Sequence, residues 1–276
     1  MTILITGGTG NTGRPLVETL RARGSDVRVA ARGPGPDGVP FDWTAPETHA
    51  RALAGARAVY LVPPPLTLDP MPMTGPFLEA ARAAGVRRVV MLGSLLVPRG
   101  ASGAAELGDA VRSFPEWAEL RPSGFMQNFT GAHPVAEGIR RHGEIRSATG
   151  AGRLGWIDAA DIAAVAAEVL SAPGPVAAEH VLTGPESLGY ADAAAIIAAA
   201  AGRPVRHTAA PVAELARRNL DAGMPEPFAA ALAGVDADIA RGGADRVTDT
   251  VRRLTGRQPR SFADFARARR EEWAAT

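Results

Sequence analysis

The chain has 276 residues, a net charge of +1 and no cysteine. This length suits one large α/β domain, or one domain with a small appendage. The balanced charge indicates neither a nucleic-acid nor a membrane partner, and the absence of cysteine excludes disulfides and thiolate chemistry. No signal peptide and no apolar run of about 18 residues is recognised. We therefore expect a cytoplasmic protein.

The first thirteen residues carry the strongest signal. A β-branched run at 3–6 leads into a glycine-rich turn, and a helix is expected from about 12 to 23. Glycine permits a tight turn and lets the backbone approach a pyrophosphate, which the amino end of the helix then attracts. The alternative is a strand–turn–helix without a ligand. The expected nucleotide contacts in the turn are Gly7, Thr9, Gly10, Asn11, Thr12 and Gly13.

Strands and helices alternate through the first half of the chain. Strands are expected at 27–31, 58–62, 88–92 and 117–120, with a short one ending at 41–43 after a Gly/Pro-rich loop at 33–38. Helices are expected at 47–54, 73–84 and 103–112. This alternation predicts a doubly wound parallel sheet of the Rossmann type, in the α/β class.

The second half is mostly helical. Helices are expected at 132–141, 159–170, 190–201, 211–222, 227–240, 246–255 and 262–273, with one strand at 180–182. We expect a nucleotide-binding core over residues 1–125 and a smaller, mostly helical lobe over 126–276, with about 155–184 returning to the core. Such a lobe would cover the carboxyl ends of the strands, where ligands bind in these folds.

Arg32 indicates which dinucleotide is bound. It ends the second strand, where NAD-binding proteins carry an acidic residue that accepts from the ribose 2′-hydroxyl. A guanidinium instead binds a 2′-phosphate through charge-assisted bonds worth roughly 1.5–3 kcal/mol each. The sequence therefore predicts NADP(H) as the cofactor. The alternative is a solvated arginine at a strand end.

Further cofactor contacts are expected where other strands end. Asp42 could accept from the adenine amine and Trp43 could lie along the ring, although Trp43 could equally be a half-buried loop aromatic. Ser94 could bind the nicotinamide carboxamide or the substrate, although a turn-forming hydroxyl is equally plausible. The edge formed by Val62, Pro63 and Pro64 would contact the cofactor through shape and carbonyl groups.

The chain resembles the NmrA-like, atypical short-chain dehydrogenase/reductase family over essentially its whole length. The residues that carry this are the glycine turn, Arg32, and the segments 120–129, 157–163 and 182–186. The tail segments 223–227 and 255–262, with Phe265 and Trp273, resemble the branch that contains the ergot-alkaloid reductases festuclavine synthase and agroclavine dehydrogenase. Quinone and triphenylmethane reductases are further relatives. The resemblance implies an NADP-binding fold and hydride transfer, and it leaves the substrate open.

The sequence lacks the usual proton donor of short-chain dehydrogenases, a Tyr-x-x-x-Lys pair. It contains no lysine and two tyrosines, Tyr60 and Tyr190, for which we expect packing roles. Hydride transfer to an iminium ion neutralises an existing charge, and a quinone spreads the new charge over a conjugated oxygen that water can protonate. An activated acceptor is therefore predicted, either a cyclic imine or iminium ion or a quinone-like molecule. An NADP(H) sensor without turnover is the main alternative, and an isomerase or lyase with NADP as a prosthetic group is a weaker one.

Apolar side chains after the strand at 117–120 suggest a flat, aromatic substrate. Core packing is the alternative for each of them. The five histidines lack the spacing of metal ligands, so no metal is expected, and His49 is expected on a surface helix. The chain is expected to be a monomer or a homodimer. The expected substrate contacts are Ser94, Phe125, Met126, Asn128, Phe129 and Trp156.

Overall fold

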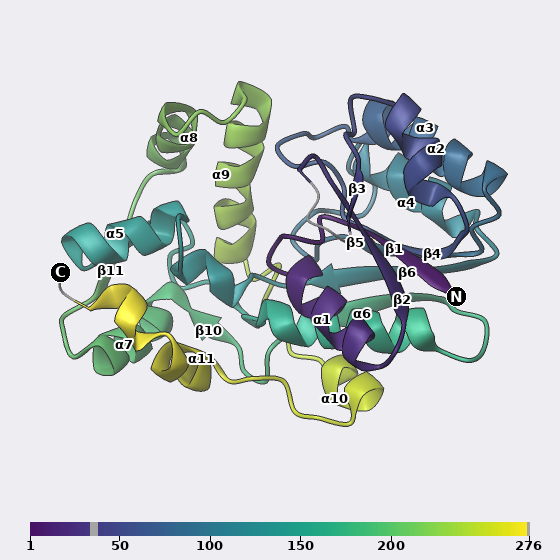
Figure 1. The fold of residues 1–276 in the computed structure, drawn as a ribbon. Helices are drawn as coiled ribbons and strands as arrows, with labels where there is room; N and C mark the ends of the chain where they lie inside the picture. Colours follow the sequence, from purple (N-terminus) through teal and green to yellow (C-terminus); the bar gives the residue numbers. More distant parts are fainter. Residues whose placement is uncertain (34–37, 275–276) are drawn as a thin grey trace. The chain divides into compact units, whose positions relative to one another are not determined.

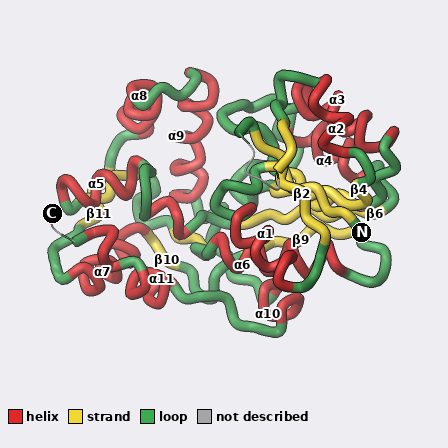
Figure 2. Tube along the Cα trace, in the orientation of Figure 1, coloured by secondary structure: helices red, strands yellow, loops and turns green. Residues whose placement is uncertain are grey.

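A seven-stranded sheet dominates the computed structural model, which describes residues 1–33 and 38–274 (Figures 1 and 2). The strand order is β3-β2-β1-β4-β5-β6-β9. Neighbouring strands from β3 through to β6 pair in parallel. The strands are β1 (Thr2–Thr6), β2 (Asp26–Ala31), β3 (Gly38–Pro40), β4 (Ala56–Leu61), β5 (Arg88–Leu92), β6 (Glu116–Pro122) and β9 (Ala177–Leu182). The predicted α/β fold is confirmed.

The strand order reverses direction between β1 and β4. In the register, Ile5 of β1 lies beside Val29 of β2 on one side and Tyr60 of β4 on the other. The carboxyl ends of these parallel strands therefore meet at one edge of the sheet. In doubly wound sheets the ligand binds at this edge, where the strand order reverses.

Helices cover both faces of the sheet (Figure 1). Helices α1 (Gly13–Ala22) and α6 (Ala159–Ser171) lie on one face, and α2 (Glu47–Leu53), α3 (Met71–Ala83) and α4 (Ala104–Arg112) lie on the other. Leu4, Val59 and Val89 of the sheet pack with Leu53 and Phe77 in one buried cluster. Burial on both faces explains why these strands read as near-continuous apolar runs.

The chain divides into two compact units. Unit 1 comprises residues 1–121 and 160–181, and unit 2 comprises 122–159 and 182–276. The division falls four residues before the expected end of the core at 125, and the segment that returns to unit 1 spans 160–181 rather than about 155–184. No helix among the described residues combines the length and apolarity needed to cross a membrane.

Unit 2 is mostly helical and has two small sheets. β7 (Glu144–Ser147) pairs in parallel with β11 (Arg206–Ala209), and β8 (Arg153–Leu154) pairs antiparallel with β10 (Leu188–Gly189). Phe129, Phe262 and Trp273 are fully buried in this unit. The helices are α5 (Pro134–His142), α7 (Tyr190–Ala201), α8 (Val212–Asp221), α9 (Glu226–Ala240), α10 (Thr250–Thr255) and α11 (Phe262–Ala268), with short 3-10 turns at Met126–Phe129 and Arg270–Trp273.

Three expected elements differ from the observed ones. The short third strand ends at Pro40, because a turn begins at Asp42, where the Asp42 carboxylate accepts from the amide of Thr44. The helix expected at 246–255 forms only from Thr250, and the one expected at 262–273 ends at Ala268 before a 3-10 turn. Residues 34–37 of the expected loop at 33–38 lie outside the described residues.

Candidate functional site

The glycine turn joins β1 to α1 with no room for side chains at three positions. Gly7 has a φ of +64°, and its carbonyl accepts from the amide of Gly10 at 2.9 Å. A Cβ on Gly13 would lie 2.2 Å from the oxygen of Gly7, and one on Gly8 would lie 2.7 Å from a methyl of Val29. The backbone therefore packs closely at the carboxyl end of β1, as a pyrophosphate-binding turn requires.

The amino end of α1 faces this turn without a capping side chain. Thr12 is at the N-cap position, and no side chain among the described residues caps the helix there. Thr9 and Asn11 are exposed, whereas Thr12 is buried. The free amides and the partial positive charge of the helix make this end suited to an anion.

Buried hydroxyl groups connect the glycine turn to the neighbouring strand β4. The Thr6 Oγ1 atom accepts from the amide of Val62 at 2.8 Å, so it ties β1 to the end of β4. The Tyr60 hydroxyl donates to the Thr12 Oγ1 atom at 3.2 Å, and burial raises the pKa of this phenol. Tyr60 is fully buried, so its expected packing role is confirmed.

Arg32 and Asp42 lie near one another beyond the ends of β2 and β3. Arg32 is exposed. The Asp42 Oδ1 atom accepts from the amide and the hydroxyl of Thr44 at 2.8 and 2.7 Å. These two bonds, and then the nearby charge of Arg32, lower the pKa of Asp42. The structure thus brings together the two polar residues expected at the adenosine end.

Trp43 is half-buried, and its ring belongs to an aromatic cluster. Its edge packs against Phe41 and Phe77, with ring centroids 4.8 and 5.2 Å away. His49 is stacked on Phe41 in the same cluster, and its Nε2 atom lies 3.1 Å from the carbonyl oxygen of Asp42. The expectation of a surface position for His49 is wrong, because its side of α2 faces the core. Burial lowers its pKa.

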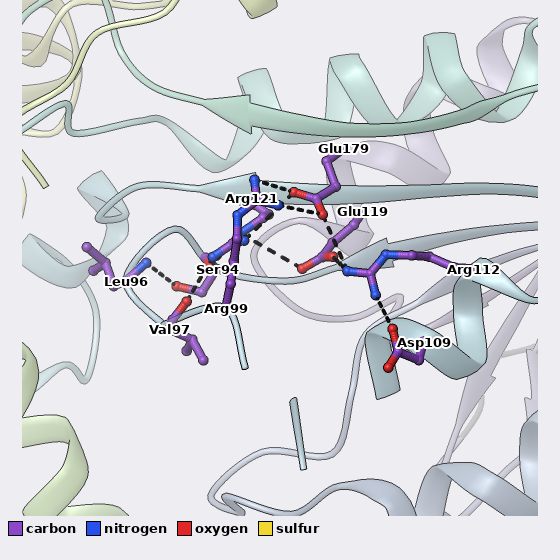
Figure 3. Close-up of polar contacts among 9 residues, drawn as sticks. All are labelled: Ser94, Leu96, Val97, Arg99, Asp109, Arg112, Glu119, Arg121 and Glu179. Carbon is purple, nitrogen blue, oxygen red and sulfur yellow. Dashed lines mark hydrogen bonds and ion pairs between the residues drawn. The ribbon is translucent and has the colours of Figure 1, made fainter. Parts of the chain in front are cut away.

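The ends of β4 and β5 complete this edge. Val62 lies against the glycine turn, since a Cβ on Gly7 would be 3.1 Å from the Val62 Cβ atom. Pro63 is half-buried and Pro64 is buried. Ser94 follows β5, and its Oγ atom accepts from the amide of Leu96 at 3.1 Å (Figure 3). Ser94 therefore has the turn-forming role that the sequence left open.

Five expected substrate contacts fall in unit 2, and three of them are in its interior. Met126 and Phe129 are completely buried and Trp156 is almost so. Phe129 and Trp156 meet edge to face at 4.8 Å, and the indole donates to the carbonyl of Leu188. This burial favours core packing for these three. Phe125 and Asn128 are half-buried and keep surface that a ligand could contact.

Sequence reasoning missed an ionic cluster in unit 1. Glu119 and Arg121 lie on β6 and Glu179 lies on β9, with Arg112 of α4 beside them (Figure 3). The signal was present, because β6 carries three charged residues, Glu116, Glu119 and Arg121, and charged side chains in a strand inside a sheet need partners. Among the described residues, no group of three or more histidine, aspartate or glutamate side chains is placed to hold a metal.

These features define a nucleotide-binding α/β protein. The glycine turn exposes its backbone at Gly7 and Gly10, and the uncapped helix suits the phosphates of a dinucleotide, so the residues present fit the expected cofactor. The NAD(P)H-binding family matches residues 7–173, and the chain belongs to this family. Within it, the chain is an NmrA-like atypical short-chain dehydrogenase/reductase that binds NAD(P)H.

Three similar proteins illustrate the relationship. An uncharacterized oxidoreductase, YesF, of Bacillus subtilis is 42% identical over 278 residues, covering 99% of this chain and 96% of that protein. Agroclavine dehydrogenase of Claviceps fusiformis is 34% identical, with 99% of both chains covered. The NADPH-dependent quinone oxidoreductase of Escherichia coli, solved with NADPH, is 25% identical with a TM-score of 0.81, covering 96% of this chain and 98% of that one.

Proposed function

We propose that this protein is an NADPH-dependent reductase that transfers hydride to an activated acceptor, either a cyclic imine or iminium ion or a quinone-like molecule. Its relatives are NAD(P)H-dependent oxidoreductases. The observation that carries the preference for NADPH is Arg32, an exposed arginine at the end of β2.

The cofactor would be held by backbone at one end and by charge at the other. When bound, NADPH supplies the hydride. The amides of the glycine turn would hold the pyrophosphate, and Arg32 would hold the 2′-phosphate. Asp42 and Trp43 are proposed to contact the adenine, Val62, Pro63 and Pro64 to border the cofactor, and Ser94 to donate to the carboxamide or the acceptor.

The acceptor class follows from which proton donors the chain provides. Both phenols are buried, burial raises both their pKa values, and there is no lysine to activate either one. Hydride transfer to a neutral ketone creates an alkoxide that requires such a donor. A cationic acceptor is neutralised by the hydride, and a quinone spreads the new charge over a conjugated oxygen that water protonates. Phe125 and Asn128 are the proposed substrate contacts that unit 2 still offers.

Replacing Arg32 tests the cofactor preference. We expect Arg32→Glu to weaken NADPH binding about 10- to 100-fold, because each lost charge-assisted bond contributes about 1.5–3 kcal/mol. NADH binding should change much less. Dissociation constants from fluorescence titration provide the measurement. Arg257→Glu makes the same charge change at an exposed position in unit 2 and should leave the preference unchanged. Tighter binding of NADH than NADPH by the native protein would refute the preference.

Turnover tests the acceptor. Stopped-flow absorbance should show oxidation of NADPH on mixing the protein with members of a panel of cyclic imines and quinones. A matched set of simple ketones should give no comparable rate. Equal affinity for NADP+ and NADPH, with no oxidation by any acceptor, would instead identify an NADP(H) sensor.

A further inference from the structure

The loop that follows β5 is bonded to a buried arginine on the neighbouring strand. Arg121 is 6% exposed. Its Nε atom donates to the carbonyl of Ser94 at 3.2 Å, and its Nη2 atom donates to the carbonyl of Val97 at 2.8 Å (Figure 3). One rigid guanidinium therefore sets the distance between two points of the loop that presents the Ser94 hydroxyl.

Two carboxylates balance the charge of Arg121 without taking its shortest bonds. The Glu119 Oε1 atom lies 3.9 Å from its Nε atom, and the Glu179 Oε2 atom lies 3.8 Å from its Nη1 atom. Both distances are longer than those to the loop carbonyls. The carboxylates thus hold the guanidinium in the interior, while its hydrogen bonds go to the loop.

The same carboxylates tie further points of the loop and of α4. Glu179 pairs with Arg99, near the far end of the loop, at 2.6 Å. Arg112 lies 3.5 Å from Glu119 and 3.3 Å from Glu179. At the near end, a Cβ on Gly93 would lie 2.7 Å from the Glu119 Oε1 atom, so the loop begins directly against this carboxylate.

The small net stabilisation expected from buried ion pairs indicates that the cluster of Arg121, Glu119 and Glu179 serves the geometry of the loop. Burial raises the pKa of Glu119, and the charge of Arg121 opposes this effect most strongly. Buried ion pairs are often no more stabilising than apolar residues of similar volume. An apolar layer would pack β6 and β9 equally well, but it could not bond the carbonyls of Ser94 and Val97.

We propose that Arg121 is a positioning residue, which fixes the loop from Gly93 to Arg99 so that the Ser94 hydroxyl is held at the carboxyl edge of the sheet. This inference rests on the proposed function for the role of Ser94, whereas the effect on the loop is independent of it. The Ser94 Oγ atom accepts from the amide of Leu96 inside this loop, so the conformation of the loop also sets where the hydroxyl lies.

Arg121→Lys tests the inference, with Arg88→Lys as a matched control. Lysine keeps the charge but cannot bridge two carbonyls in a fixed geometry. Arg88 is also a buried arginine that bonds carbonyls and a glutamate, but it lies at the amino end of β5. Hydrogen–deuterium exchange of residues 93–99 should be at least tenfold faster in Arg121→Lys and unchanged in Arg88→Lys. Unchanged exchange in Arg121→Lys, or equal acceleration in both, would overturn the inference.

Kinetics separate this inference from the proposed function. Arg121→Lys should lower kcat about tenfold and leave the NADPH dissociation constant within about twofold, and it should have no further effect on kcat in a Ser94→Ala background. Additive losses of kcat would contradict positioning through Ser94. If none of the acceptors supports oxidation of NADPH by the native protein, the proposed function fails. The exchange experiment still tests the effect of Arg121 on the loop in that case. Should Arg121→Lys not fold, Glu179→Gln keeps Arg121 and should accelerate exchange of the same residues by a smaller factor.

Discussion

Single glycines decide whether the nucleotide turn can form. The position of Gly13 is the tightest in the turn, because its hypothetical Cβ would meet backbone atoms of Gly7 and Gly8, which cannot rotate away. A clash with a flexible side chain can be relieved by a rotamer change, but a clash with backbone requires the chain to move. The turn can therefore adopt this geometry only because residue 13 has no Cβ atom.

We expect Gly13→Ala to abolish NADPH binding and to lower the free energy of unfolding by about 3 kcal/mol or more, as overpacking against backbone does. Gly234→Ala is the matched control. Gly234 lies within α9, and a Cβ there would meet nothing within 4 Å, so alanine should raise the free energy of unfolding by about 0.5–1 kcal/mol. Urea denaturation and NADPH titration measure both effects. Native binding by Gly13→Ala would contradict this account of the turn.

The sequence predicted the positions of some of these residues far better than the positions of others. The glycines and Arg32 could be placed because their spacing from one strand fixes where they lie. Phe129 and Trp156 could not, because their burial depends on Tyr190 and Phe262, which lie distant in the sequence. The role of Arg121 was hidden for the same reason, since its partners come from a loop and from another strand.

At the scale of elements, α5 shows how a helix end couples to pH. His133 is at its N-cap, and its Nδ1 atom accepts from the amide of Val135 at 3.2 Å, which requires that nitrogen to be unprotonated. Burial, and then the charge of Arg218, lower the pKa of His133 to about 4. The folded state therefore binds fewer protons than the unfolded state between about pH 4 and pH 6.5.

The sign of this linkage gives a prediction. The contribution of His133 to the free energy of unfolding is fully present above pH 6.5 and is lost as the pH falls to 4, by at most about 3 kcal/mol. Asparagine is a good N-cap that does not titrate. From pH 7 to pH 4.5 the free energy of unfolding of the native protein should therefore fall by about 2 kcal/mol relative to that of His133→Asn. Urea denaturation at both pH values tests this, and parallel profiles would contradict it.

Buried apolar strands were predicted well, whereas short polar strands were missed. The strands at 3–6, 58–62 and 88–92 are apolar runs buried on both faces, so their sequences alone identify them. β7 and β11 each have four residues, most of them polar, and only their pairing with one another makes them strands. A pairing of this kind between distant segments leaves little trace in either sequence.

At the scale of the whole molecule, unit 1 is not one continuous segment. α6 and most of β9 return to it after an excursion of 38 residues into unit 2, at 122–159. Arg88 donates to the carbonyls of Val169, Leu170, Ala172 and Gly174, so the returning segment satisfies this buried charge. The nucleotide-binding unit is therefore completed only late in the chain.

A fragment ending at residue 125 should consequently fail to fold. It would leave Arg88 without its four carbonyls, Trp117 without the carbonyl of Val176, and β6 as an open edge. Removing partners from a buried charge is strongly destabilising, by about 3–5 kcal/mol. Far-UV circular dichroism and amide chemical-shift dispersion should both indicate an unfolded chain. A cooperative thermal transition in this fragment would show that the returning segment is dispensable.

The hydroxyls of Thr6, Tyr60 and Thr12 form hydrogen bonds within the protein, so these contacts beneath the glycine turn form without a nucleotide. Such preorganisation spares a ligand the entropy of ordering its own receptor. A nucleotide can then bind and dissociate without reordering this part of the turn. If the turn is preorganised in this way, calorimetry should measure nearly the same heat capacity change on binding of the oxidised and the reduced nucleotide.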